Sequence, residues 1–269
     1  MNLLTDDPAA IASRFLSARR QAAGLDSYPG DFPETLADAY AVQDAAIAAW
    51  GKPILGWKVG RINSPLAERF GADRLAGPIF TVETAGASGE GPDMPVFAEG
   101  FAAGEAEFLL RVGRAPPAGQ TRFTLDEAAD LIESVHVGIE IASSPLGRIN
   151  KLGPIAVISD FGNNNGLVVG APIPDWRSTG FEQWQVSTML DGVEAGAGRA
   201  TAFPEGAIGA ARFLFELMAK RGIAVRAGQW ISSGAVTGVH DARPGQRVEA
   251  RFGEGYGVAC TLSAARPEP

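Results

Sequence analysis

Three glutamates lie within short apolar segments, and they constrain what this chain can fold into more than any other feature. Glu105 and Glu107 lead into the apolar run 108–112, whose length and composition predict a β-strand. Because side chains alternate along a strand, these two glutamates would share one face. Glu140 falls within a second apolar segment, 135–141, where the same alternation applies. Three carboxylates in apolar surroundings are costly unless positive charge compensates them.

A divalent cation is one way to compensate this cluster. An all-oxygen donor set suits a hard ion such as magnesium, manganese or calcium better than it suits zinc. The alternative is that Glu105 and Glu107 form an exposed strand end while Glu140 pairs with an arginine. Spacing alone leaves both interpretations open.

A lysine occupies a similarly apolar setting. Lys58 lies in the segment from Pro53 to Gly60, a predicted strand with glycines at positions 56 and 60. Burying an ammonium group costs several kcal/mol unless it has an anionic partner. Lys58 is therefore predicted to be either a structural ion-pair partner or a functional amine beside the carboxylates.

Composition and charge narrow the class of protein. With 46% hydrophobic and 20% charged residues, the chain is typical of a soluble globular protein. Its net charge of −8 argues against nucleic acid or an anionic membrane as a partner. A single cysteine, Cys260, rules out an internal disulfide, and only two histidines argue against a zinc site. No signal-peptide pattern opens the chain and no apolar run approaches the ~20 residues of a membrane span, so we expect a cytoplasmic protein.

Helices are predicted mainly near the start of the chain, and strands dominate the rest. Capping residues and apolar spacing predict helices over 8–24 and 35–51. The chain contains no internal repeat and no clean linker. We therefore expect one mixed α+β domain over 1–269, in which a helical segment (1–52) packs on a strand-rich body (53–269).

Several shorter elements are predicted within that body. Helices are expected at 124–133, from a capping box, and at 204–221. Strands are expected at 154–158, 167–169, 184–190, 248–252 and 258–262, and Asp191-Gly192 predicts a hairpin turn. The small-residue stretch 195–202 and the glycine- and proline-rich stretch 85–95 are predicted loops, the latter mobile.

Three polar features of the body allow alternative interpretations. The asparagine- and glycine-rich run 160–166 predicts a turn, because these residues tolerate positive φ. His136 shares a face with Glu140 at about 13 Å along the strand, which favours a hydrogen-bonded structural histidine over a metal ligand. In the segment 228–238, a strand runs into small hydroxyl and glycine residues that could offer amides and hydroxyls to a ligand.

Five segments together resemble a known family. Tyr40-Ala41-Val42-Gln43, Gly56-Trp57-Lys58-Val59-Gly60, the Glu105-x-Glu107 pair, Gly138-Ile139-Glu140-Ile141 and 228–238 follow the order of the 2-keto-4-pentenoate hydratases. These enzymes belong to the fumarylacetoacetate hydrolase superfamily, as do the 4-oxalocrotonate decarboxylases. The resemblance implies a mixed β-sandwich roll with N-terminal helices, usually assembled as a homo-oligomer. It also implies that Glu105, Glu107 and Glu140 bind Mg²⁺ or Mn²⁺ and that Lys58 is the catalytic lysine beside the substrate.

The activity implied by this resemblance is a metal-dependent hydratase. Such an enzyme adds water to a 2-hydroxy-2,4-dienoate and gives a 4-hydroxy-2-oxo acid, in the catabolism of aromatic-derived acids. Ser233, Thr237 and Asp160 would be the substrate-binding residues. A 4-oxalocrotonate-type decarboxylase or an acylpyruvate hydrolase on the same metal site is an alternative. An inactive homologue that binds a keto acid is an alternative of another class.

Overall fold

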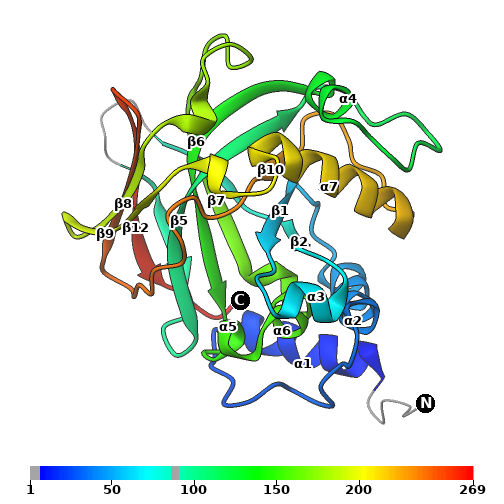
Figure 1. Cartoon of the computed structure of the whole chain (residues 1–269). Helices are drawn as coiled ribbons and strands as arrows, with labels where there is room; N and C mark the ends of the chain where they lie inside the picture. Colours follow the sequence, from blue (N-terminus) through cyan, green and yellow to red (C-terminus); the bar gives the residue numbers. More distant parts are fainter. Residues whose placement is uncertain (1–6, 86–90, 269) are drawn as a thin grey trace.

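Two mixed β-sheets form the body of the molecule, and helices lie around them (Figure 1). The computed structural model describes residues 7–85 and 91–268. The larger sheet has the strand order β2-β1-β10-β5-β6-β7-β3, and the smaller has the order β4-β12-β11-β8-β9. The strands of the larger sheet are β1 (Gly56–Arg61), β2 (Arg74–Ile79), β3 (Val82–Thr84), β5 (Phe101–Val112), β6 (Ile132–Ser144), β7 (Asn164–Pro172) and β10 (Trp230–Ser232). Those of the smaller sheet are β4 (Asp93–Val96), β8 (Val186–Leu190), β9 (Val193–Gly198), β11 (Arg247–Phe252) and β12 (Tyr256–Ala264).

Strands β5 and β6 pair antiparallel at the centre of the larger sheet. Nearly every residue of both strands is buried, so both faces of this pair are covered. On one face, the ring of Phe108 contacts those of Phe181 and Phe252, at centroid distances of 4.8 and 5.2 Å. A charged side chain in the central part of either strand therefore enters the interior, whereas Arg111 and Glu133, near the outer ends of the strands, reach solvent.

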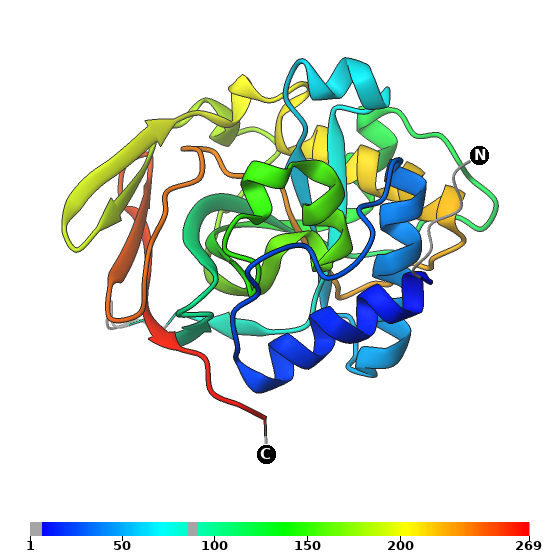
Figure 2. The ribbon, with the colours of Figure 1, turned by 90° about the horizontal axis from the view of Figure 1, so that it is seen from below.

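The N-terminal helices begin where the sequence predicts. Asp7 and Thr35 accept hydrogen bonds from the first turns of α1 (Pro8–Gln21) and α2 (Leu36–Trp50). Figures 1 and 2 show both helices at one end of the larger sheet, together with α5 (Ile149–Leu152) and α6 (Pro154–Ser159). The remaining helices are α3 (Leu66–Phe70), α4 (Leu125–Asp130), α7 (Gly206–Arg221), and the 3₁₀ turns η1 (Phe161–Asn163), η2 (Phe181–Gln183) and η3 (Ala200–Ala202). The predicted α+β class is confirmed.

One predicted strand is wrong. The apolar run 154–158 forms helix α6, with Pro154 at its first position after Gly153, whose φ is 87°. Proline suits this position because its fixed φ matches the helix and its missing N–H is not needed there. The segment is buried almost all round, so its apolar residues show no helical period that would separate it from a strand.

A second difference concerns the small-residue stretch that begins at Ala195. Residues 195–198 belong to β9, which pairs with β8, and 200–202 form η3. The chain segment 236–240 passes close to the two glycines of this part of β9. A Cβ on Gly198 would come within 2.2 Å of the carbonyl oxygen of Val236. Within the predicted mobile loop 85–95, residues 86–90 lie outside the described residues, and 93–96 form β4. In the described ranges, no helix is long and apolar enough to span a lipid bilayer.

Candidate metal centre

The antiparallel register of β5 and β6 brings the three glutamates together. Glu105 stands opposite Glu140 across the strand pair, and Glu107 stands opposite Gly138. One oxygen from each of the three carboxylates lies within 4.8 Å of the others. All three side chains are buried, and Glu107 and Glu140 are fully inaccessible, at 0%. The alternative of an exposed strand end is therefore wrong.

Two of these carboxylates have one oxygen held by the protein and one without a hydrogen bond. Glu107 Oε2 accepts hydrogen bonds from the Ser232 hydroxyl and, at 2.8 Å, from the backbone N–H of Gly234. Glu140 Oε1 accepts a hydrogen bond of 2.9 Å from the side-chain amide of Asn164. Glu107 Oε1 and Glu140 Oε2 are buried without any hydrogen bond. Buried polar atoms rarely go without a hydrogen bond, and a hard cation fits this all-oxygen set.

Lys58 is the cation that the fold supplies to this cluster. On β1 it stands between Gly77 of β2 and Ser232 of β10. Its Nζ lies 3.5 Å from Glu140 Oε2 and its side chain is buried. The partner of Glu140 is thus a lysine, not the arginine that the sequence left open. The aliphatic part of the Lys58 side chain packs against Gly162. A Cβ added at Gly162 would come within 2.9 Å of Lys58 Cδ.

The electrostatics of the cluster reflect an excess of negative charge. Burial, together with repulsion from Glu140, raises the pKa of Glu105 from 4.5 to about 8, although Lys58 opposes this shift. Burial and the neighbouring carboxylates also raise the pKa of Glu107 well above its ordinary value. Burial alone would lower the pKa of Lys58, but the three carboxylates outweigh it and raise this pKa. One lysine does not neutralise three glutamates, so the site favours a further positive charge.

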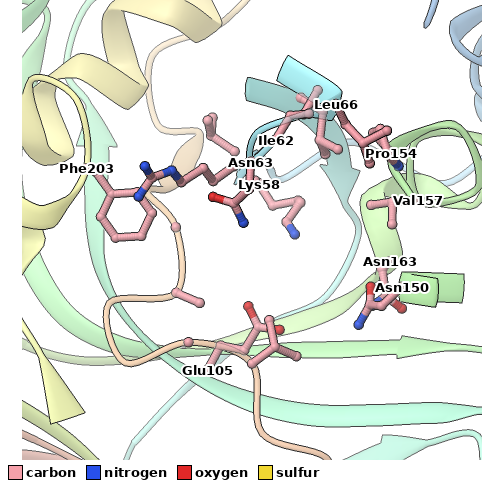
Figure 3. A pocket seen from close by; sticks show the side chains of 18 of the residues that line it. Lys58, Ile62, Asn63, Leu66, Glu105, Asn150, Pro154, Val157, Asn163 and Phe203 are labelled. Carbon is pink, nitrogen blue, oxygen red and sulfur yellow. The ribbon is translucent and has the colours of Figure 1, made fainter. Parts of the chain in front are cut away.

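A cavity of about 570 Å³ opens onto this cluster. Figure 3 shows Lys58 and Glu105 directed toward its open space from different sides, with Asn150 and Asn163 on one flank and Phe203 on another. Apolar side chains form much of the remaining wall, among them Ile62, Leu66 and Val157. The cavity therefore combines a polar, carboxylate-bearing region with walls that suit a hydrocarbon chain.

Comparison with solved structures identifies the fold. A 4-oxalocrotonate decarboxylase from Pseudomonas putida G7, complexed with magnesium and adipate, superposes with a TM-score of 0.78 at 20% identity, over 97% of this chain and 99% of that one. A fumarylpyruvate hydrolase from Pseudomonas aeruginosa, in complex with Mn²⁺ and pyruvate, superposes with a TM-score of 0.53 at 14% identity, over 78% and 89%. A 5-carboxymethyl-2-hydroxymuconate delta-isomerase from Mycobacterium smegmatis gives a TM-score of 0.55 at 15% identity, over 79% and 81%. The chain has the fumarylacetoacetate hydrolase fold. No protein-family profile matches its sequence.

Within this fold, the three predicted substrate-binding residues lie outside the cavity lining, as does Glu140. Asp160 forms a buried ion pair with Arg19, whose Nε lies 2.6 Å from Asp160 Oδ1, and it also accepts from the Ser144 hydroxyl. Its carboxylate is thus already neutralised, and we assign it no substrate contact. The Thr237 hydroxyl is hydrogen-bonded to that of Thr188 at 2.7 Å. Ser233 is buried beside the lining residue Gly234 but does not itself line the cavity.

Other residues at the site were not predicted individually from the sequence, although three of them lie in the segments 160–166 and 228–238. Ser232 and Asn164 hold Glu107 and Glu140, and Asn150 and Asn163 line the cavity. Asn163 belongs to the predicted turn and has a φ of 65°, and its Oδ1 is buried without a hydrogen bond. The sequence did contain an indication of these residues, because three consecutive asparagines, 163–165, follow soon after the apolar segment 154–158. His136 is hydrogen-bonded to Ser134 and to the Gly170 carbonyl, which confirms its predicted structural role.

Proposed function

We propose that this protein is a divalent-metal-dependent lyase that acts on a small unsaturated 2-oxo acid. The observation that carries the proposal is the trio of Glu105, Glu107 and Glu140, in which two buried oxygens accept no hydrogen bond and, among the described residues, Lys58 is the cation paired with the cluster. These three residues would hold Mg²⁺ or Mn²⁺. The superposed decarboxylase and hydrolase, which are complexed with magnesium and Mn²⁺, support this proposal. When bound, the cation would supply Lewis acidity toward the oxygens of the 2-oxo acid.

The residues of the chain would divide the remaining tasks. Lys58, whose Nζ lies beside Glu140, would orient the substrate carboxylate and deliver a proton to the carbon that acquires one. Asn163, with its unpaired Oδ1, would accept a hydrogen bond from the substrate or from a water molecule. The apolar walls would exclude bulk water and strengthen these interactions.

Decarboxylation is the reaction that the cavity supports best. Within the described part of the chain, its lining contains no histidine, aspartate, cysteine or tyrosine, and its acid–base groups are Lys58, Glu105 and Glu107. Loss of carbon dioxide from an oxalocrotonate-like acid requires an electron sink and one proton donor, which these residues and a cation would supply. The superposition over nearly the full length of a 4-oxalocrotonate decarboxylase supports the same reaction.

Hydration of a 2-hydroxy-2,4-dienoate is the second candidate. It needs a group that places the attacking water, and the buried unpaired Oδ1 of Asn163 is the observation that favours it. Hydrolysis of an acylpyruvate is less well supported. It requires an additional base for water, such as a histidine–glutamate pair, and the described lining holds none.

One experiment distinguishes these reactions. Chelator-treated protein is mixed with 4-oxalocrotonate or 2-hydroxypenta-2,4-dienoate, and ultraviolet absorbance and product mass are followed before and after Mg²⁺ or Mn²⁺ is restored. A metal-dependent product lighter by one carbon dioxide supports decarboxylation, and one heavier by one water supports hydration. Absence of turnover in every combination would contradict the lyase proposal and leave the inactive homologue. Unchanged metal affinity in Glu107→Gln would contradict the site itself.

A further inference from the structure

Arg61 is a second cation at the cavity, apart from the glutamate cluster. It ends strand β1, three residues after Lys58, and it lines the same cavity. At strand rise, the Cα atoms of Lys58 and Arg61 are about 10 Å apart. The cavity thus presents positive charge at two separated places, and Lys58 is already engaged by carboxylates.

The guanidinium of Arg61 is anchored without being neutralised. Its Nη1 donates a hydrogen bond of 3.2 Å to the Ala202 carbonyl, and it lies over the Phe203 ring at 5.8 Å. Both contacts come from residues that also line the cavity. Among residues 7–85 and 91–268, no aspartate or glutamate forms an ion pair with Arg61. The planar guanidinium of Arg61 is thus held in place without an acidic partner of its own, which suits it to bind a carboxylate.

The neighbouring strand adds to the positive charge. Arg61 stands opposite Arg74 of β2, and the buried Arg74 donates to the backbone carbonyls of Pro204 and Gly206. The nearby Glu205 is paired with Arg212. The lining therefore carries its negative charge at the glutamates and an uncompensated positive charge at Arg61.

We propose that Arg61 binds a second carboxylate of the substrate and makes the cavity selective for dicarboxylic 2-oxo acids. This inference rests on the proposed function, because it takes the 2-oxo acid end to lie at the glutamate cluster. The apolar side chains of Ile62 and Leu66, which follow Arg61 in the chain and line the cavity, would cover the hydrocarbon between the two ends.

Arg61 would act in binding and not in bond cleavage. Pairing with a guanidinium stabilises a carboxylate relative to carbon dioxide, so the contact does not lower the barrier to decarboxylation. Its loss should therefore raise KM for a dicarboxylic substrate and should not lower kcat. A residue that only anchored the loop 200–203 would affect monocarboxylic and dicarboxylic ligands alike.

The test compares two non-reacting ligands of equal length, 2-oxohexanedioate and 2-oxohexanoate, by calorimetric titration of the full-length Mg²⁺-loaded protein. The native protein should prefer the diacid by on the order of 10-fold or more. Arg61→Gln, which keeps an N–H for the Ala202 carbonyl, and Arg61→Leu should abolish this preference while leaving affinity for the monoacid unchanged. The matched control is Arg199→Gln, because Arg199 also donates to a carbonyl, that of Gln183, but does not line the cavity.

The contrary outcomes separate the two proposals. No diacid preference in the native protein, or a preference that survives in both Arg61 variants, would overturn the role of Arg61 and leave the metal site standing. Failure of both ligands to bind the native Mg²⁺-loaded protein would overturn the proposed function and the role of Arg61 with it.

Discussion

The side-chain amide of Asn164 donates a 2.9 Å hydrogen bond to Glu140 Oε1, and Glu140 Oε2 is thereby left as the oxygen without a hydrogen bond. Partners of this kind orient metal ligands, and their loss typically lowers metal affinity by about 10- to 100-fold. We expect Asn164→Ala to weaken Mg²⁺ and Mn²⁺ binding by that factor in calorimetric titrations. Asn165→Ala is the control, because Asn165 contacts Arg19 and Pro95 and not a glutamate of the cluster. Equal effects of the two substitutions would contradict this role.

The raised pKa of Glu105 predicts how the metal-free protein responds to pH. Its folded-state pKa of about 8 exceeds the ordinary value of 4.5, so the folded state binds more protons between these values. The stabilisation from this proton is complete below the lower value and is lost as pH rises through the higher one. The melting temperature of chelator-treated protein should therefore fall from about pH 5 to about pH 8. Glu105→Gln should flatten this dependence, and a melting temperature that rises with pH would contradict the assignment.

Metal binding should release protons from the same carboxylates. A cation needs them ionised, whereas burial raises the pKa of both, that of Glu105 to about 8, so that Glu105 is largely protonated at about pH 7. Mg²⁺ titrations in two buffers of different ionisation enthalpy should give different apparent heats, and the difference counts the protons released. Identical heats in the two buffers would show that the site is already ionised.

Lys58 is predicted to matter for turnover more than for metal binding. Its ammonium faces the cavity and competes with the metal for the carboxylates, so Lys58→Met should retain metal affinity. Loss of the proposed proton donor should lower single-turnover rates by about 10²- to 10⁴-fold. A variant that loses metal and activity together would indicate that Lys58 supports the site and does not act on the substrate.

The core of the site was predictable because β-strand alternation is a strong local rule. Glu105, Glu107 and Glu140 could be placed in strands from their apolar neighbours, and the burial of Lys58 followed from its own segment. The pairing of Glu105 with Glu140 could not be predicted, since register depends on contacts between distant segments.

Site residues that lie in turns or at the ends of strands and helices were harder to predict from the sequence. Asn164 and Asn163 lie in a run whose amides first indicate a turn, and only the folded chain brings them to Glu140 and the cavity. Arg61 is an exposed residue at a strand end, a position with no sequence signal of function. Asp160 was predicted to bind the substrate but instead pairs with Arg19 on α1, a partner too distant in the chain to be inferred from the sequence.

Gly162 tests how tightly the turn after α6 positions the lysine. Its φ of 70° already disfavours a side chain, and an added Cβ would come within 2.9 Å of Lys58 Cδ and of the backbone at Gly77. Gly180 provides a matched control, because its φ of 64° is similar and nothing lies within 4 Å of an added Cβ. Gly180→Ala should therefore cost only the backbone strain, about 1 kcal/mol in the free energy of unfolding.

Gly162→Ala should cost more than Gly180→Ala in denaturant unfolding and should also lower kcat, because the contact displaces the lysine stem. Metal affinity should change little, since the glutamates belong to β5 and β6. Equal unfolding free energies for the two variants, with kcat unchanged, would mean that Lys58 moves aside without consequence. The packing of the lysine against this turn would then be incidental, and the positioning of its Nζ would depend on Glu140 alone.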